Sequence, residues 1–198
     1  MPEGHSKPSR GPMLVLIVWL VVALVVGRMR LLESVPRIVL QLTLLSLTFC
    51  CLLAFWKSRA VNNWVMSRPV RVLISFHVVR FVGIYFLVLY RRGELPFAFA
   101  VPGGIGDIAV AFMALLIGLF SVNDPPNRPL VLIWNTLGLL DILFVVITAA
   151  RLGLKHADSM LALTHLPLSL LPTFFVPLII ASHLIIFYRL GRRGQSHA

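Results

Sequence analysis

Residues 70–90 read VRVLISFHVVRFVGIYFLVLY, an apolar run with a histidine and an arginine near its middle. A helix needs about 20 predominantly apolar residues to cross about 30 Å of bilayer hydrocarbon, and this run is long enough. A charged side chain at that depth costs about 2.5 to 3.5 kcal/mol on insertion scales. His77 and Arg80 therefore mark the part of the chain where polar chemistry is expected.

Five further apolar segments surround this one, at residues 13–27, 38–56, 96–120, 130–150 and about 168–188. The whole chain is 59% hydrophobic with a mean hydropathy of +0.93, and a soluble protein of that composition would expose large apolar patches. Segment 13–27 is short and also resembles a signal peptide. We interpret it as a retained first helix. The sequence thus predicts an all-α integral membrane bundle of six transmembrane helices in one domain, residues 13–190.

The net charge of +11 comes from 18 lysines and arginines against 7 acidic residues. A basic composition can indicate nucleic-acid binding. Here the basic residues fall between the apolar runs, as the flanking charges of membrane helices do. We therefore expect the lipid bilayer as a partner and no nucleic acid.

The distribution of basic residues predicts an orientation. With six helices, both termini and the second and fourth loops lie on one side, with ten basic residues: Lys7, Arg10, Lys57, Arg59, Arg68, Arg71, Arg128, Arg189, Arg192 and Arg193. The other side has seven: Arg28, Arg30, Arg37, Arg91, Arg92, Arg151 and Lys155. The positive-inside rule then predicts a multi-pass protein of the cell (inner) membrane, with cytoplasmic tails at residues 1–12 and 191–198.

Polar residues inside the apolar segments fall at two depths. At 1.5 Å per residue, His77, Asn135 and His183 each lie about 8 to 9 Å from the same side of the membrane. Arg80 and Asp141 lie deeper, at roughly 14 to 17 Å. Buried ionisable residues usually pair with one another or line a pathway. The sequence predicts that these residues form a polar cluster among the third, fourth, fifth and sixth helices.

Asp107 joins this cluster through its position in the fourth segment. It follows Pro102-Gly103-Gly104, which predicts a broken helix near Pro102 to Gly104. Asp107 would then lie in the first turn of the second half, where the helix dipole favours a carboxylate. Asp107 and Asp141 are both candidates to pair with Arg80, in an ion pair that either serves a site or only holds helices together.

Two histidines at matching depth also allow a second interpretation. His77 and His183 could be the axial ligands of a haem b, if both rings face one cavity. We otherwise expect no cofactor and no metal. The adjacent Cys50 and Cys51 have neither a disulfide framework nor the spacing of zinc ligands.

Several short motifs share a resemblance. They are Arg80-Phe81-Val82-Gly83, Gly93-Glu94-Leu95-Pro96, Gly106-Asp107-Ile108, Trp134-Asn135 and Gly138-Leu139-Leu140-Asp141. Together they resemble a pattern in small uncharacterised bacterial membrane proteins with several transmembrane helices. The resemblance covers roughly the third to sixth helices and implies no activity.

No catalytic triad, zinc site or nucleotide-binding signature is present, and an enzyme is not the expected function. The leading expectation is a membrane protein that binds or translocates a small polar solute or a proton. Its site would consist of His77, Arg80, Asp107, Asn135, Asp141 and His183. The alternatives are a haem- or quinone-linked electron-transfer or assembly protein, and a structural membrane subunit without a ligand.

Overall fold

The computed structural model describes residues 10–120 and 127–194, and this part of the chain contains helices and no strand. The α-helices are α1 (Gly11–Arg28), α2 (Arg37–Lys57), α3 (Arg59–Met66), α4 (Val70–Phe76), α5 (Gly83–Arg91), α6 (Phe97–Phe120), α7 (Arg128–Lys155) and α8 (Val176–Gly194). The remaining helical segments are two 3₁₀ segments, η1 (His77–Val82) and η2 (Ala157–Thr164), and a π-helical turn, η3 (Leu171–Phe175).

The predicted all-α class and the six apolar segments are confirmed. Six helical stretches are long and apolar enough to cross a membrane: Gly11–Arg28, Arg37–Lys57, Val70–Arg91, Phe97–Phe120, Arg128–Lys155 and Leu171–Arg192. The predicted tails lie largely outside the described residues. Residues 191–194 of the predicted C-terminal tail belong to α8.

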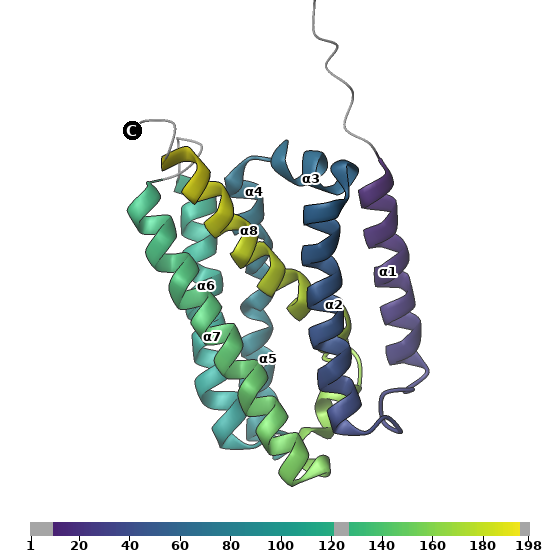
Figure 1. The fold of residues 1–198 in the computed structure, drawn as a ribbon. Coiled ribbons are helices and arrows are strands. Elements are labelled where there is room, and N and C mark those ends of the chain that lie inside the picture. The colour runs from purple at the N-terminus through teal and green to yellow at the C-terminus, as the bar shows by residue number, and fades with distance from the viewer. Residues whose placement is uncertain (1–9, 121–126, 195–198) are drawn as a thin grey trace, which may run out of the picture.

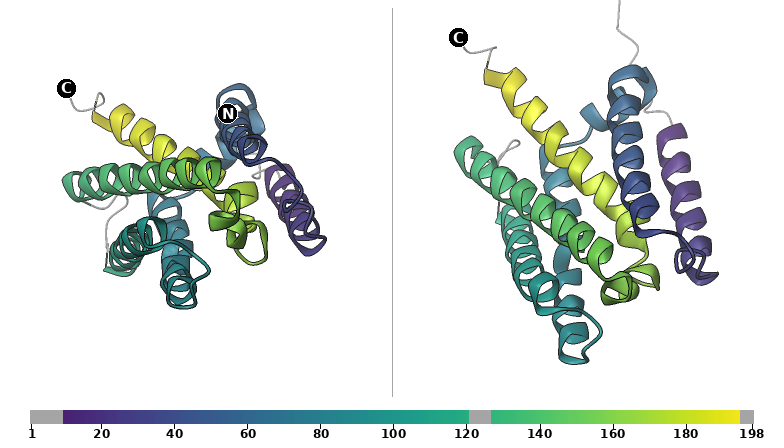
Figure 2. Two further views of the ribbon diagram at one scale, coloured as in Figure 1. Left: turned by 90° about the horizontal axis from the view of Figure 1, so that it is seen from below. Right: turned by 60° about the horizontal axis from the view of Figure 1, so that its bottom comes forward.

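The last long helix is the centre of the bundle. Figure 1 shows α8 crossing the molecule between α2 on one side and α7 on the other, and it packs against both. In the most apolar 18-residue window of Leu171–Arg192, 67% of the residues are buried, whereas in that of Gly11–Arg28 the share is 17%. The view from below in Figure 2 places α1 at the margin of the molecule, away from α6 and α7.

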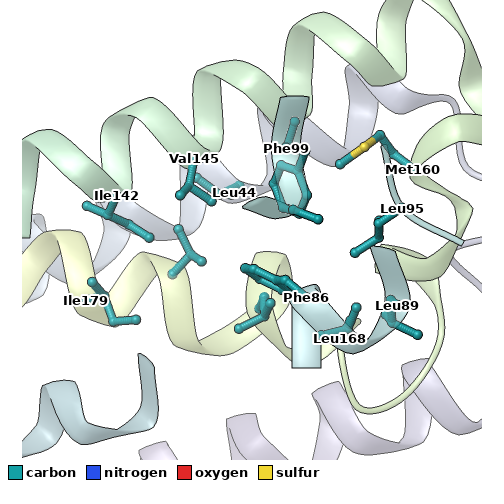
Figure 3. Packing of buried hydrophobic residues seen from close by; sticks show 14 of the residues in the cluster. Leu44, Phe86, Leu89, Leu95, Phe99, Ile142, Val145, Met160, Leu168 and Ile179 are labelled. Carbon is teal, nitrogen blue, oxygen red and sulfur yellow. The ribbon is translucent and has the colours of Figure 1, made fainter. Parts of the chain in front are cut away.

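Apolar side chains fill one end of the interior. Figure 3 shows Phe86 and Leu89 of α5, Phe99 of α6 and Val145 of α7 in one apolar cluster. Phe86 and Phe99 pack with ring centroids 5.1 Å apart. Phe86 and Val145 of this cluster line the same small cavity as Arg80 and Asp107, so these polar residues have apolar neighbours on that side.

The predicted break near Pro102 to Gly104 is wrong, because α6 is continuous from Phe97 to Phe120. Pro102 stands within the first two turns, so its missing N–H costs one hydrogen bond near the helix end. The glycines serve close packing instead. A Cβ at Gly104 would lie 2.8 Å from the carbonyl oxygen of Gly83, so α5 and α6 touch backbone to backbone.

Irregular backbone occurs in two other spans. The stretch Val70–Arg91 winds as a 3₁₀ helix over η1, and the stretch Leu171–Arg192 begins with the π turn η3. Inside a long span, 3₁₀ and π segments are uncommon and often mark functional positions. Both segments lie against the polar site described next.

Candidate functional site

Arg80 lies at the centre of a charged group that we call the triad, formed with Asp107 and Asp141. Its Nε donates to Asp107 Oδ1 at 2.6 Å, and its Nη2 donates to Asp141 Oδ2. Its Nη1 donates to the carbonyl oxygen of Gly138 at 2.9 Å. The sequence left Asp107 and Asp141 as alternatives, and the structure brings both to the same guanidinium.

The three members of the triad differ in burial. The side chains of Arg80 and Asp107 are 1% and 4% exposed, and that of Asp141 is 17% exposed. One guanidinium faces two carboxylates, so the fully ionised triad has a formal charge of −1. Two carboxylates that share one site do not both ionise easily, because like charges disfavour the second ionisation. Within the triad, one carboxylate charge therefore has no matching cation.

The 3₁₀ winding of η1 aims the key side chains inward. Side chains three residues apart eclipse each other in a 3₁₀ helix, so His77 and Arg80 point the same way. Gly83 is three residues further on, where α5 meets the backbone of α6. The local backbone thus places both side chains on the inner face of η1, where Arg80 contacts α6 and α7 and His77 contacts α7 and α8.

Two glycines make room for this arrangement. A Cβ at Gly106 would collide with the carboxylate of Asp141. A Cβ at Gly138 would lie 2.7 Å from Cε1 of His183 and 3.1 Å from its Nε2. Both glycines stand in the sequence motifs, where they could have indicated close approach of a functional side chain.

A second, neutral group lies next to the triad, and we call it the histidine layer: His77, Asn135, Ser182 and His183. Asn135 Nδ2 donates to the backbone oxygen of His183 at 3.0 Å. Asn135 Oδ1 is therefore the acceptor in its 2.8 Å contact with His183 Nδ1. In this arrangement the proton of His183 lies on Nδ1 and its Nε2 is an acceptor.

His77 has the opposite tautomer. Ser182 Oγ donates to the carbonyl oxygen of Ile179 at 2.8 Å, so it accepts from His77 Nε2 at 3.0 Å. The remaining ring nitrogens, His77 Nδ1 and His183 Nε2, are buried without a hydrogen-bond partner. The structure thus places two acceptor nitrogens in one buried layer, beside a triad with a negative formal charge.

Trp134 closes the histidine layer from the side of α7. Its indole ring centroid lies 5.0 Å from that of His77 and 5.7 Å from that of His183. Its Nε1 donates to the carbonyl oxygen of Val110 at 3.1 Å, which fixes the ring. His77, Asn135 and His183 are each 0% exposed.

All six residues predicted from the sequence meet in these two adjacent groups. The depth estimate brought His77, Asn135 and His183 to one level, and they lie within one connected layer. Ser182 was not predicted. Its only signal in the sequence is a hydroxyl next to His183 inside an apolar helix.

The histidine pair does not fit a bis-histidine haem. Such a haem has one imidazole on each face of the porphyrin, with an iron–nitrogen bond of about 2 Å on each side. The ring centroids of His77 and His183 are 4.2 Å apart, which leaves no space for a macrocycle between the two rings. We do not assign haem to this pair.

The family described as Domain of unknown function (DUF8737) matches residues 36–191. The chain belongs to this family. The DUF8737 match begins just before α2 and ends within α8, so it contains the triad and the histidine layer and leaves out α1. No curated protein and no solved structure matched the chain. The family's name carries no activity, and the polar interior is the chemically distinctive part of this DUF8737 protein.

Proposed function

We propose that this protein is a multi-pass protein of the cell membrane that binds and exchanges a proton at the triad. The observation that carries the proposal is one guanidinium held by two carboxylates, Asp107 and Asp141, within spans that are otherwise apolar. A formal charge of −1 in a low-dielectric interior strongly favours uptake of one positive charge. A proton on a carboxylate supplies that charge without any change in packing.

The size of the site favours a proton over an organic solute. The cavity beside Arg80 and Asp107 has a volume of about 20 Å³, whereas ligand pockets for small molecules hold about 300 to 1,000 Å³. The more exposed carboxylate, Asp141, is the position at which the proton enters and leaves.

The first test is proton movement into vesicles. The purified protein is placed in liposomes that contain a pH-sensitive dye, and a potassium diffusion potential drives protons inward. We expect faster acidification than in protein-free liposomes, and loss of that excess in Asp141→Asn. Thr136→Val is the matched control on α7, since the Thr136 hydroxyl is exposed and binds only the carbonyl oxygen of Leu132. Wild-type rates equal to those of protein-free liposomes would refute proton exchange across the membrane.

A second measurement tests proton binding by itself. A protonated carboxylic acid has an infrared C=O band that an ionised carboxylate lacks. We expect one such band in the wild-type protein near neutral pH, and its loss in Asp141→Asn. A spectrum without that band would show that the triad holds its negative charge unprotonated.

The geometry also favours a structural role as a second candidate. Arg80 joins η1 to α6 through Asp107 and to α7 through Gly138 and Asp141. Replacing buried ion groups by apolar residues of similar volume is often neutral or stabilising when they only hold helices together. If the triad only holds helices together, the triple change Arg80→Met, Asp107→Leu, Asp141→Leu should fold with a thermal stability equal to or above that of the wild type. Under the proton proposal, it folds and loses proton exchange.

We further propose that both termini are cytoplasmic. The basis is the excess of lysine and arginine on the side that holds the termini. Reporter fusions after Gly191 and at Gly93 should give opposite signals, because the two positions lie at opposite ends of the bundle. Identical signals would refute this topology.

A further inference from the structure

Trp19 lies near the middle of α1, eight residues after the first residue of that helix, Gly11. At 1.5 Å per residue, this position is about 12 Å along the helix. Tryptophans of membrane helices are enriched at the membrane interfaces, where the polar end of the ring reaches the headgroups. Trp19 instead donates its Nε1–H to the backbone oxygen of Thr173, at 2.9 Å. A hydrogen-bond donor at this depth serves another part of the protein.

The acceptor of this hydrogen bond lacks its usual donor because of a proline. In an α-helix, the carbonyl of Thr173 accepts from the N–H of residue 177. Residue 177 is Pro177, which has no N–H and whose ring clashes with the carbonyl four residues earlier. The backbone here forms the π turn η3, in which the N–H of Val176 binds the carbonyl of Leu171. Bilayer hydrocarbon offers no water to a backbone carbonyl, so the indole of Trp19 supplies the donor that Pro177 cannot.

The rest of the contact allows α1 to approach η3 closely. The Trp19 ring packs edge-on against Phe174, with ring centroids 4.9 Å apart. Ala23 and Gly27 follow Trp19 at intervals of four residues, and both are buried. A Cβ at Gly27 would collide with the Oγ of Ser169. Small residues four apart are typical of helices that pack closely in membranes, so the face of α1 that carries Trp19 is its packing face.

The π turn also forms part of the wall beside the triad. Leu171, the first residue of η3, and Val176, the first residue of α8, line a small cavity. Arg80 and Asp107 border the same cavity, and its other lining residues are apolar. Charges interact more strongly where water is excluded. The position of η3 therefore affects the electrostatics of the triad.

We propose that Trp19 is a positioning residue, whose N–H replaces the backbone donor that Pro177 lacks and thereby holds η3 in place beside the triad. α1 lies outside the stretch that matches the family, and this hydrogen bond connects it to the site. The effect on proton exchange rests on the proposed function, while the anchoring of η3 rests on the hydrogen bond and the proline. Displacement of η3 would admit water to the triad, which weakens the electrostatic drive for proton uptake.

The first test separates the N–H donor from the aromatic ring. Trp19→Phe removes the N–H and keeps a ring beside Phe174. Trp56→Phe is the matched control, because Trp56 is 57% exposed on α2. In protein with ¹³C at the threonine carbonyls, Trp19→Phe should move one infrared amide component to higher frequency, since a carbonyl stretch rises when its hydrogen bond is lost. Trp56→Phe should leave the component in place. An unchanged threonine component in Trp19→Phe would refute the anchor.

A proline substitution provides the rescue. Pro177→Ala restores an N–H opposite the carbonyl of Thr173, whereas Pro172→Ala restores one opposite Leu168, whose carbonyl already accepts a backbone N–H at 2.9 Å. We expect Trp19→Phe to lower the melting temperature by about 2 to 4 °C, the size of one hydrogen bond in a chain of this length. The loss should disappear in the Pro177→Ala background and persist in the Pro172→Ala background. Equal losses in the two backgrounds would contradict the role given to the proline.

Proton movement into liposomes distinguishes this proposal from the proposed function. Trp19→Phe should exchange protons up to about tenfold more slowly, the rate equivalent of one hydrogen bond, and Pro177→Ala should restore the rate. A wild-type protein without proton movement, together with the threonine shift and the rescue, refutes the proposed function and retains the anchor. Unchanged or faster exchange in a Trp19→Phe protein with the threonine shift refutes the link between η3 and the triad. If Trp19→Phe does not fold, its combination with Pro177→Ala should fold and that with Pro172→Ala should not, and failure of both refutes the anchor.

Discussion

The triad and the histidine layer are neighbours in one interior, yet they satisfy their polar atoms in different ways. In the triad, the guanidinium of Arg80 binds two carboxylates and a backbone oxygen, and the formal charges do not balance. In the histidine layer the groups are neutral and the charges balance, but two ring nitrogens lack hydrogen-bond partners. Charge is in excess in one group, and hydrogen-bond acceptors are in excess in the other.

This difference predicts which of the two groups contributes more to stability and which responds to protons. A buried charge without its partner is far more costly than a neutral acceptor without a donor. The triad should therefore dominate the free energy of unfolding, and it should also be the group that responds to protons. The histidine layer should mainly position α7 against α8. The following changes test this division, from the largest expected effect to the smallest.

Arg80→Gln should have the largest effect. It leaves two carboxylates, Asp107 and Asp141, without their cation in an apolar interior, and breaking a buried ion pair from one side typically costs about 3 to 5 kcal/mol. We expect a loss of this size in the free energy of unfolding, measured in mixed detergent micelles. Arg30→Gln is the control, because Arg30 is 68% exposed and pairs only with Glu33. A loss below about 1 kcal/mol for Arg80→Gln would place the triad among surface-like ion pairs.

Asp107→Asn and Asp141→Asn should lower the free energy of unfolding by different amounts. Asp107 is 4% exposed and accepts the 2.6 Å hydrogen bond from Nε, so its neutralisation should cost about 1.5 to 3 kcal/mol. Asp141 is 17% exposed, and Asp141→Asn leaves the balanced pair Arg80–Asp107 in place, so its cost should stay within about 1 kcal/mol. Thermal unfolding of the two single variants and the double variant measures this. A larger loss in Asp141→Asn would reverse the assignment of the principal partner.

Gly138→Ala tests the boundary between the two groups. Its Cβ would lie 2.7 Å from Cε1 of His183, so the imidazole has to move or α7 has to shift. Overpacking of this kind typically costs about 1 to 3 kcal/mol. Gly191→Ala is the control, since nothing lies within 4 Å of a Cβ at that position. Equal stability of the two variants would mean that His183 is not held against α7.

The sequence predicted which residues form the two groups better than it predicted the backbone conformation that positions them. Hydropathy located the spans, and a rise of 1.5 Å per residue brought His77, Asn135 and His183 to one depth, because small changes in helix winding alter depth little. Winding itself was not predictable. Spacings of three and four residues look alike in an apolar run, so nothing in residues 77–82 indicated a 3₁₀ helix.

The partners within the site were also only partly predictable. The rule that a buried arginine needs a carboxylate gave Asp107 and Asp141 as alternatives, but it could not give a shared guanidinium, which depends on helix rotation. The same limit applied to Pro102, where the cost of a proline depends on how close it lies to the helix start. Ser182 was missed because a serine hydroxyl can satisfy itself within its own helix.

Ser182→Ala should change the free energy of unfolding less than the changes at Arg80, Asp107 and Gly138. It also gives the most direct comparison of the histidine layer with the triad. It removes the acceptor of His77 Nε2, at 3.0 Å, and leaves the triad untouched. The histidine layer is neutral, so a double-mutant cycle of Ser182→Ala with His77→Leu should give a coupling of about 0.5 to 1.5 kcal/mol. The corresponding cycle of Arg80→Leu with Asp107→Leu should give a larger coupling, because both partners are charged. Thr43→Ala is the control for loss of a hydroxyl, since Thr43 is exposed and bonds only within its own helix. A coupling at Ser182 as large as that at Arg80 would mean that the histidine layer is charged, and the division between the two groups would fail.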